Sequence, residues 1–211
     1  MSRRQSTGTW IVIASGNSLK EKDCEKVKIW KEKGCQPPGE EKTKNVIVIN
    51  TTFRRALWAD VLYACDGPWW DEYIDEVKCS FTGNCWTQDL DSSARYNLSY
   101  IEAKGLPGLG KEKIIHTGEN GGYQAINLVY LLGASKIILL GMDMMEVDGE
   151  SHWHGNHPGY LNRNSPYSRW VKNFDSLARD LYAAGVDVVN ATRTTALNCF
   201  KKVNLEDVLC Q

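Results

Sequence analysis

Short apolar runs that alternate with amphipathic stretches constrain the fold of this 211-residue chain most strongly. Buried strands are expected at residues 10–14, 45–50, 61–64, 113–116, 136–141 and 186–190. Helices are expected at residues 19–30, 68–77, 123–132, 167–184 and 205–209. Apolar strands that alternate with helices are typical of a mostly parallel sheet covered on both faces. The sequence therefore predicts an α/β fold, doubly wound and Rossmann-like, in a single nucleotide-binding domain over residues 1–211.

Two segments do not follow this alternation. Residues 79–112 are rich in glycine and are expected to form a short strand and a long loop, and residues 146–166 form a polar loop that holds three of the four histidines. We expect these two loops to form a small lid over the ligand site, because loops near a sheet edge commonly cover binding sites.

Charge and composition exclude some classes of partner. The net charge of −1 argues against the basic surface of most nucleic-acid-binding proteins. No apolar run reaches the ~18–20 residues that span a bilayer, and the polar start of the chain does not resemble a signal peptide. The seven cysteines form no C-x-x-C pair, which favours free thiols in a cytoplasmic, reducing compartment. Four tryptophans fit a homo-oligomer contact, a stacking surface or the core equally well: Trp58, Trp69, Trp70 and Trp86.

Ligands of open parallel sheets bind beyond the carboxyl ends of the strands, so polar residues after the strands are the candidate site. Gly16, Asn17 and Ser18 follow the first strand, where a helix start favours an anion; a tight turn with a helix cap is the alternative. Asn50 ends the second strand and has an amide suited to a ribose or a base edge. Asp66 ends the third strand and either faces the same crevice or caps the next helix.

A second glycine-rich turn precedes the helix at 123–132. Its residues Thr117, Gly118, Glu119 and Asn120 are candidates to hold a phosphate or nucleobase; a loop that needs positive φ angles is the alternative. Asp143 ends the strand at 136–141 and is a candidate to bind ribose, metal or substrate.

The histidine-rich loop carries the candidate proton-transfer groups. His154 and His157 lie in the run Ser-His-Trp-His-Gly-Asn-His over residues 151–157. Histidine suits general acid–base catalysis near neutral pH, and clustered histidines also suit a structural metal, although the spacing is not that of H-E-x-x-H. Arg163 and Arg169 are candidates to neutralise an anionic ligand, or lie on a solvated face.

These motifs resemble, in the same order, those of the bacterial sialyltransferases of glycosyltransferase family 42. The resemblance rests on residues 11–20, 117–123, 132–143, 151–157 and 184–192, about two-thirds of the chain. The same core is similar to the domain of archaeal 6-hydroxymethyl-dihydropterin diphosphokinases. In length and in its motifs, the chain most resembles uncharacterised bacteriophage proteins. The last resemblance implies the cytoplasm of a host cell.

The resemblance implies a fold that binds a cytidine nucleotide and transfers sialic acid from its CMP conjugate with inversion and without a metal. Asn17, Asn50, Asp66 and Thr117 would line the nucleotide, and His157, or else His154, would deprotonate the acceptor hydroxyl. The chain departs from the family in lacking a proline after Asn17 and in a histidine position shifted by one residue. It also lacks a tyrosine soon after Asp143 to hold the leaving phosphate; Tyr160 or Tyr167 would serve if the loop folds back.

The sequence therefore predicts a nucleotide-sugar-binding transferase, with a CMP-type donor favoured, an unknown acceptor and no required cofactor. Two alternatives stay open. One is a diphosphotransferase that uses Mg²⁺ held by acidic residues such as Asp66 and Asp143. The other is a non-catalytic protein that binds or sequesters a nucleotide.

Overall fold

The chain forms an α/β fold around a parallel sheet, seen in a computed structural model that describes residues 8–33, 43–161 and 165–210. Within these residues the main sheet has eight strands in the order β10-β9-β8-β1-β2-β3-β4-β5, and all their pairings are parallel. The strand bounds are β1 (Gly8–Ile13), β2 (Thr43–Ile49), β3 (Val61–Tyr63), β4 (Asn84–Thr87), β5 (Ser99–Tyr100), β8 (Lys136–Leu140), β9 (Asp187–Asn190) and β10 (Lys201–Lys202).

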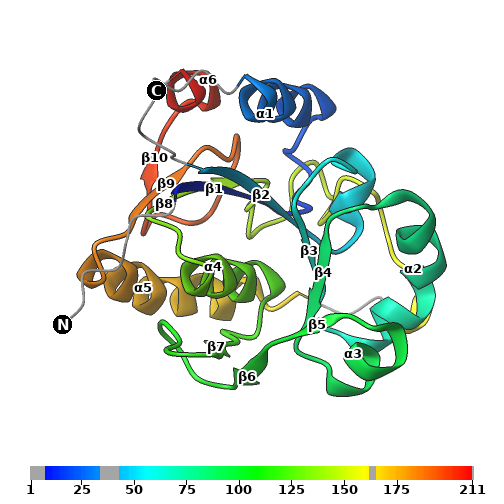
Figure 1. Cartoon of the computed structure of the whole chain (residues 1–211). Coiled ribbons are helices and arrows are strands. Elements are labelled where there is room, and N and C mark those ends of the chain that lie inside the picture. The colour runs from blue at the N-terminus through cyan, green and yellow to red at the C-terminus, as the bar shows by residue number, and fades with distance from the viewer. Residues whose placement is uncertain (1–7, 34–42, 162–164, 211) are drawn as a thin grey trace.

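Helices cover both faces of this sheet (Figure 1). The helices α1 (Glu21–Glu32), α2 (Gly67–Ser80) and α6 (Leu205–Leu209) pack on one face, and α4 (Gly121–Leu131) and α5 (Tyr167–Ala183) pack on the other. Successive residues of β1 alternate between the two cores: Ile11 and Ile13 contact the first group, and Trp10 and Val12 the second. The predicted doubly wound, Rossmann-like fold is therefore confirmed.

The strand order reverses between β1 and β8. The chain builds the sheet outwards from β1 through β2 and β3 to β4 and β5, and then returns to the other side of β1 to add β8, β9 and β10. Crossovers on opposite sides of such a point leave a crevice at the carboxyl ends of the strands. The fold itself therefore indicates where a ligand would bind.

The segment 79–112 holds more regular structure than the expected strand and loop. It contributes β4 and β5 to the main sheet, α3 (Leu90–Tyr96) between them, and β6 (Glu102–Lys104). Asp89 starts α3 as its N-cap, with its carboxylate accepting a hydrogen bond from Ser92 N at 2.8 Å, and Asn97 ends it at φ 58°.

The expected strand at 113–116 forms β7 (Ile114–His116), which pairs with β6 and not with the main sheet. The pair lies against α4 on the side away from the main sheet (Figure 1). Asn127 of α4 accepts hydrogen bonds from Gly110 N at 2.7 Å and His116 N at 3.3 Å. An almost entirely buried helix such as α4 needs cover on two sides, and β6–β7 supplies the second.

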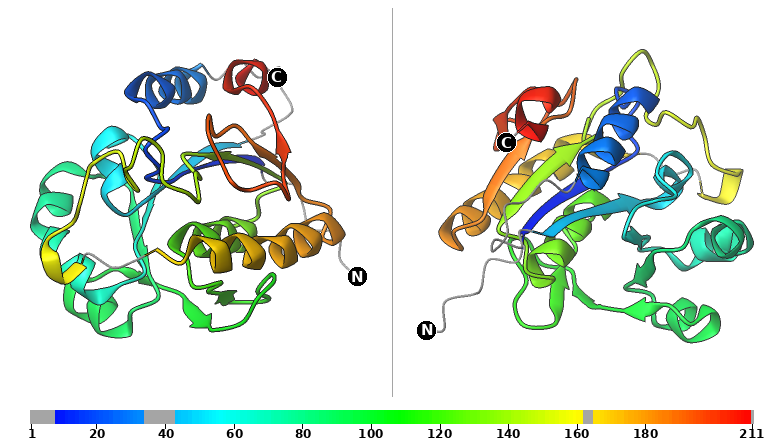
Figure 2. Two further views of the ribbon diagram at one scale, coloured as in Figure 1. Left: turned by 180° about the vertical axis from the view of Figure 1, so that it is seen from behind. Right: turned by 45° about the horizontal axis from the view of Figure 1, so that its top comes forward.

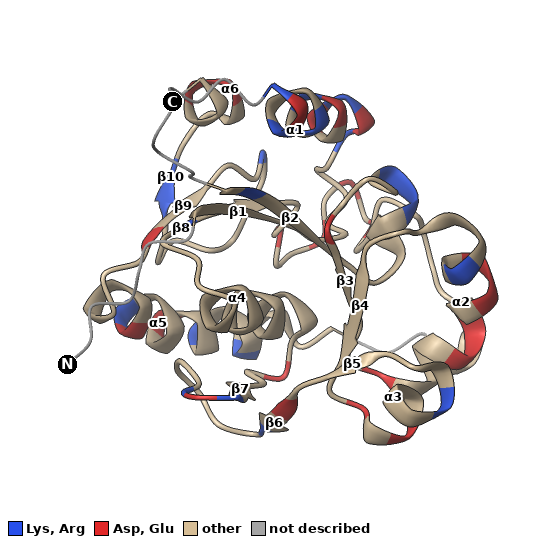
Figure 3. Cartoon of the chain, in the orientation of Figure 1, with Lys and Arg blue, Asp and Glu red and all other residues tan. Residues whose placement is uncertain are grey.

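Acidic and basic side chains are mixed on α1, α2 and α3 (Figure 3), in keeping with the near-zero net charge. None of the helices in the described parts of the chain has the length and apolarity needed to span a bilayer. Six cysteines lie in these parts and form no disulfide with one another, whereas Cys35 lies outside them.

Candidate functional site

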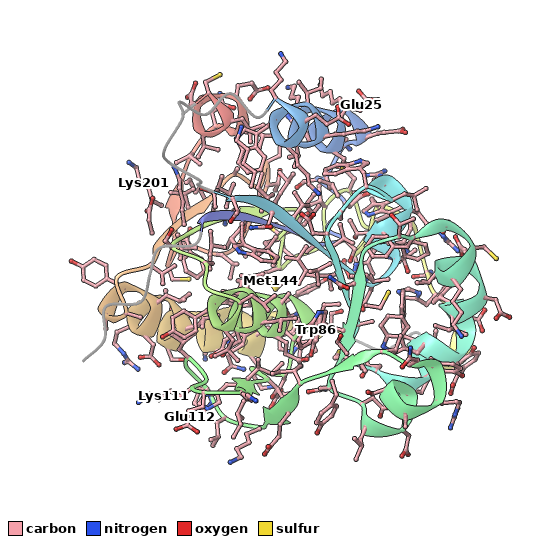
Figure 4. The ribbon with its side chains drawn as sticks, in the orientation of Figure 1. Glu25, Trp86, Lys111, Glu112, Met144 and Lys201 are labelled. Atoms are coloured by element: carbon pink, nitrogen blue, oxygen red, sulfur yellow. The ribbon has the colours of Figure 1, made fainter. Side chains whose placement is uncertain are left out.

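A cavity of about 560 Å³ lies where the carboxyl ends of β1, β2, β3 and β8 meet the N-terminus of α4. This volume lies within the ~300–1,000 Å³ typical of small-molecule sites. Met144, one of the lining residues, lies in the interior of the molecule near α4, whereas Lys111 and Glu112 lie at its periphery (Figure 4). Other lining residues from distant segments are Ser15, Gly16, Asn50, Asp66, Trp69, Thr117, Glu119, Asn120, Gly121, Gly122, Gln124, Asp143, His152, His157, Tyr167, Arg169 and Trp170.

The turn after β1 is tightly bonded to the turn after β8. A Cβ on Gly16 would lie 2.3 Å from the Asp143 carboxylate and 2.6 Å from Gly141 O, so only glycine fits there. Gly16 N donates to Gly141 O at 2.9 Å, and Ser18 donates to Asp143 through its amide at 2.7 Å and its hydroxyl at 2.6 Å. The amides of Gly16 and Ser18 are therefore not available to an anion, and α1 begins only at Glu21.

The same turn holds the histidine-rich loop in place. Asn17 Nδ2 donates to Val147 O at 2.8 Å, and Trp153 N donates to Ser15 O at 3.1 Å. Asn17 and Ser18 are not among the described residues that line the cavity. Their side chains therefore position neighbouring segments, and the expected contact of Asn17 with a nucleotide has no support in the geometry.

Asp143 is a buried carboxylate at the floor of the cavity. Burial raises its pKa, and the hydrogen bonds from Ser18 oppose that rise. Both of its oxygens are engaged by Ser18, which leaves it poorly suited as a Mg²⁺ ligand. Within the described ranges, no group of three or more His, Cys, Asp or Glu residues is placed to hold a metal ion.

Asn50 and Asp66 lie at the ends of β2 and β3 and line the cavity. Asn50 adopts φ 49°, which turns the chain sharply out of β2, and its side chain has no hydrogen-bond partner among the described residues. Asp66 occupies the N-cap position of α2 but makes no side-chain capping bond; its Oδ2 accepts from the Cys65 thiol at 3.3 Å. Asp66 therefore is the N-cap residue by position, as the alternative expected, but its carboxylate makes no capping bond and is available to a ligand.

The second glycine-rich turn leads into α4 with its first amides exposed to the cavity. Asn120 caps the helix by accepting from Tyr123 N at 3.1 Å, so its side chain serves the fold. Gly121 and Gly122 line the cavity, and their amides have no acceptor in the described chain. Such a helix start favours an anion.

The residues before Asn120 in this turn have separate roles. Thr117 lines the cavity and its hydroxyl accepts from Glu119 N at 3.4 Å. Glu119, at φ 62°, pairs with Arg169 at 2.7 Å. Gly118, at φ 48°, is required because a Cβ would lie 2.4 Å from the Tyr123 ring, and it is not among the described lining residues.

The histidine-rich loop leaves the end of β8 and passes towards α2 (Figure 2). His152 and His157 line the cavity, and His154 is not among the described lining residues. His157 Nδ1 lies 3.1 Å from the Tyr73 hydroxyl, and His152 Nδ1 lies 3.0 Å from the Ser15 hydroxyl. The ring centres of His154 and His157 are 4.7 Å apart, and those of His152 and His154 are 5.2 Å apart.

Burial makes all three histidines weak bases. It lowers the pKa of His157, helped by the positive charge of Arg54, and it lowers the pKa of His152, helped by His157. Burial together with the neighbouring histidines lowers the pKa of His154 to about 3. His154 Nε2 is buried without a partner in the described chain. The three rings are therefore neutral at pH 7.

The start of α5 also lines the cavity. Tyr167, Arg169 and Trp170 line it, and Asn173 ties α5 to the second turn by donating to Gly118 O at 2.9 Å. The Tyr167 hydroxyl and Trp170 Nε1 are buried without partners in the described residues. Tyr160 instead pairs with Glu72 at the surface. Arg163 lies outside the described residues.

The lining residues that sequence reasoning did not select include His152, Gln124 and Trp170. His152 was part of the histidine run but was not selected, and its pairing with Ser15 across 137 positions carries no local signal. Gln124 and Trp170 lie inside helices, where a polar or aromatic residue reads as ordinary helix surface or core.

Comparison of the chain with protein-family models, curated proteins and solved structures found no match.

Proposed function

We propose that this protein is a transferase that binds a nucleotide-sugar, with a CMP-type donor favoured, and transfers the sugar to an acceptor hydroxyl. The observation that carries the proposal is the convergence of the turns after β1, β2, β3 and β8 with the N-terminus of α4 on one cavity. Its size suits a nucleotide, and it combines neutral polar side chains with free helix amides.

The phosphate would lie at the start of α4. The amides of Gly121 and Gly122 supply donors with no other acceptor in the described residues, and the helix dipole favours negative charge there. Tyr167 and Trp170 also line the cavity, and each has an unpaired donor buried beside it, the Tyr167 hydroxyl and Trp170 Nε1. In this scheme Tyr167 takes the place of the missing family tyrosines, and the nucleoside would lie towards Asn50 and Asp66.

His157 would act as the general base. It lines the cavity, and the Tyr73 hydroxyl fixes its ring. When Nδ1–H donates to the Tyr73 oxygen, Nε2 carries a lone pair that takes the acceptor's hydroxyl proton. The acceptor oxygen then bonds to the sugar's anomeric carbon, and the bond from that carbon to the phosphate oxygen breaks, with the electron pair leaving on the phosphate.

Calorimetry with CMP, UDP, ATP and GTP, each with and without Mg²⁺, tests the binding step. The proposal predicts metal-independent binding of CMP. Metal-dependent binding of ATP or GTP, with none of CMP, would contradict it and favour the diphosphotransferase.

Turnover tests the chemical step. Release of CMP from a CMP-sugar should fall at least about 100-fold in the His157→Ala variant, while CMP affinity stays unchanged. Tyr73→Phe should show a smaller loss, because it removes only the group that orients the ring. CMP binding without any turnover by the wild-type protein would contradict the transferase and favour a sequestering role.

A further inference from the structure

A buried tyrosine and a buried glutamine meet at the end of the cavity nearest β3. Tyr63 is fully buried and Gln124 is 3% exposed. The Tyr63 hydroxyl donates to Gln124 Oε1 at 2.6 Å, across 61 positions of sequence. Gln124 also lines the cavity, one turn into α4.

This hydrogen bond decides which end of the Gln124 amide faces the ligand. With Oε1 bound to Tyr63, the Nε2 group is left without an acceptor among the described residues. Burial, together with the nearby Cys65 and the Asp66 carboxylate, holds the pKa of Tyr63 well above its usual range, so the phenol keeps its proton. Gln124 Nε2 is not among the fully buried, unpartnered atoms of the described residues, so it is reachable from the cavity, and a ligand that supplies an acceptor there gains a hydrogen bond.

A complementary acceptor lies on the same wall. Asp66 follows Tyr63 by three residues and lines the cavity, and its carboxylate does not cap α2. This end of the cavity therefore offers an N–H donor from Gln124 and a carboxylate acceptor from Asp66.

We infer that Tyr63 and Gln124 determine base specificity: Tyr63 orients the Gln124 amide so that Nε2 donates to a ring acceptor, while Asp66 accepts from an adjacent exocyclic amino group. The inference rests on the proposed nucleotide site. Cytosine carries that pattern, with acceptors at O2 and N3 and a donor at N4. Uracil carries N3–H and O4 in their place, which sets donor against donor and oxygen against carboxylate.

Titration calorimetry with CMP and UMP tests this on the wild-type protein and three variants. Wild type should bind CMP about tenfold or more tightly than UMP. Gln124→Glu should weaken CMP binding about tenfold, because an oxygen replaces the donor. Tyr63→Phe should keep nucleotide binding but bring the CMP/UMP ratio close to one, since the freed amide turns to accept from uracil N3–H. Tyr182→Phe, at a tyrosine that is 86% exposed, is the matched control and should match wild type.

Thermal unfolding of each variant separates loss of fold from loss of recognition. A wild-type CMP/UMP ratio in folded Tyr63→Phe would overturn the orienting role of Tyr63. Unchanged CMP affinity in folded Gln124→Glu would overturn the role of Gln124 in base recognition, while the proposed nucleotide binding would stand. Binding of neither nucleotide by wild type would instead overturn the proposed function, and the inference with it.

Discussion

The two glycine-rich turns of this protein look alike in sequence and differ in what their backbones do. In the turn after β1, the amide of Gly16 donates to Gly141 O and the amide of Ser18 donates to the Asp143 carboxylate. The turn before α4 leaves the amides of Gly121 and Gly122 facing the cavity without acceptors in the described chain. A glycine-rich strand-to-helix turn thus becomes an anion site only when no side chain, such as Asp143, already occupies its donors.

The largest expected effect comes from substituting glycine in the first turn. Gly16→Ala should destabilise the fold by about 3 kcal/mol, because its Cβ would overlap the Asp143 carboxylate and Gly141 O. Urea unfolding measures the change. Gly121→Ala is the matched control in the second turn: its Cβ meets Ile49 at an ordinary 3.5 Å, so stability should hold or rise slightly. Equal losses of stability in Gly16→Ala and Gly121→Ala would contradict the difference between the two turns.

Asp143→Asn tests the internal bonding of the first turn. The asparagine amide nitrogen would face one of the two Ser18 donors, so the free energy of unfolding should fall by about 2 kcal/mol. Ser18→Ala should cost less, since the amide bond remains. A stable Asp143→Asn variant that lost nucleotide binding would contradict the account, because Asp143 would then serve the ligand and not the fold.

Stability should also fall on acidification through the histidine loop. The folded-state pKa of His154 is lowered from 6.5 to about 3. Below pH 6.5, His154 therefore binds a proton in the unfolded chain but stays neutral in the folded chain. Between pH 7.5 and pH 5 this group should remove at most about 2 kcal/mol of stability. Urea unfolding of His154→Asn at the two pH values should show that much less loss than wild type. An equal loss in both proteins would contradict the buried, neutral state of His154.

The smallest effect on stability is expected for a solvent-exposed ion pair at the cavity. Arg169 and Glu119 form an exposed pair at the cavity wall, with side chains 63% and 51% exposed. Arg169→Ala should change the free energy of unfolding by less than about 0.5 kcal/mol, since exposed ion pairs contribute little. Its CMP affinity should fall by a few-fold if the guanidinium attracts the phosphate. A large loss of stability would show that the pair holds the second turn in place.

The sequence predicted most of the fold because local patterns encode it. The Ile and Val runs of β1, β2 and β8 marked the sheet, and the spacing of Phe174, Leu177 and Leu181 marked the buried face of α5. The pairing of β6 with β7 escaped prediction, since it depends on α4 needing cover on its second side. Among candidate site residues, Asn50, Asp66, Thr117 and His157 were placed at the cavity because they follow strands or carry distinctive chemistry. Gln124 was missed because its partner Tyr63 is distant in sequence.

The backbone amides of the two turns give the most direct test of the central claim, that a phosphorylated nucleoside binds with its phosphate at the start of α4. Amide chemical shifts of the labelled protein would be followed by NMR during a titration with CMP and, separately, with cytidine. The account predicts large shifts at Gly121 and Gly122 with CMP, much smaller ones with cytidine, and little change at Gly16 and Ser18. Shifts concentrated at Gly16 and Ser18, or the same shifts with cytidine as with CMP, would contradict it.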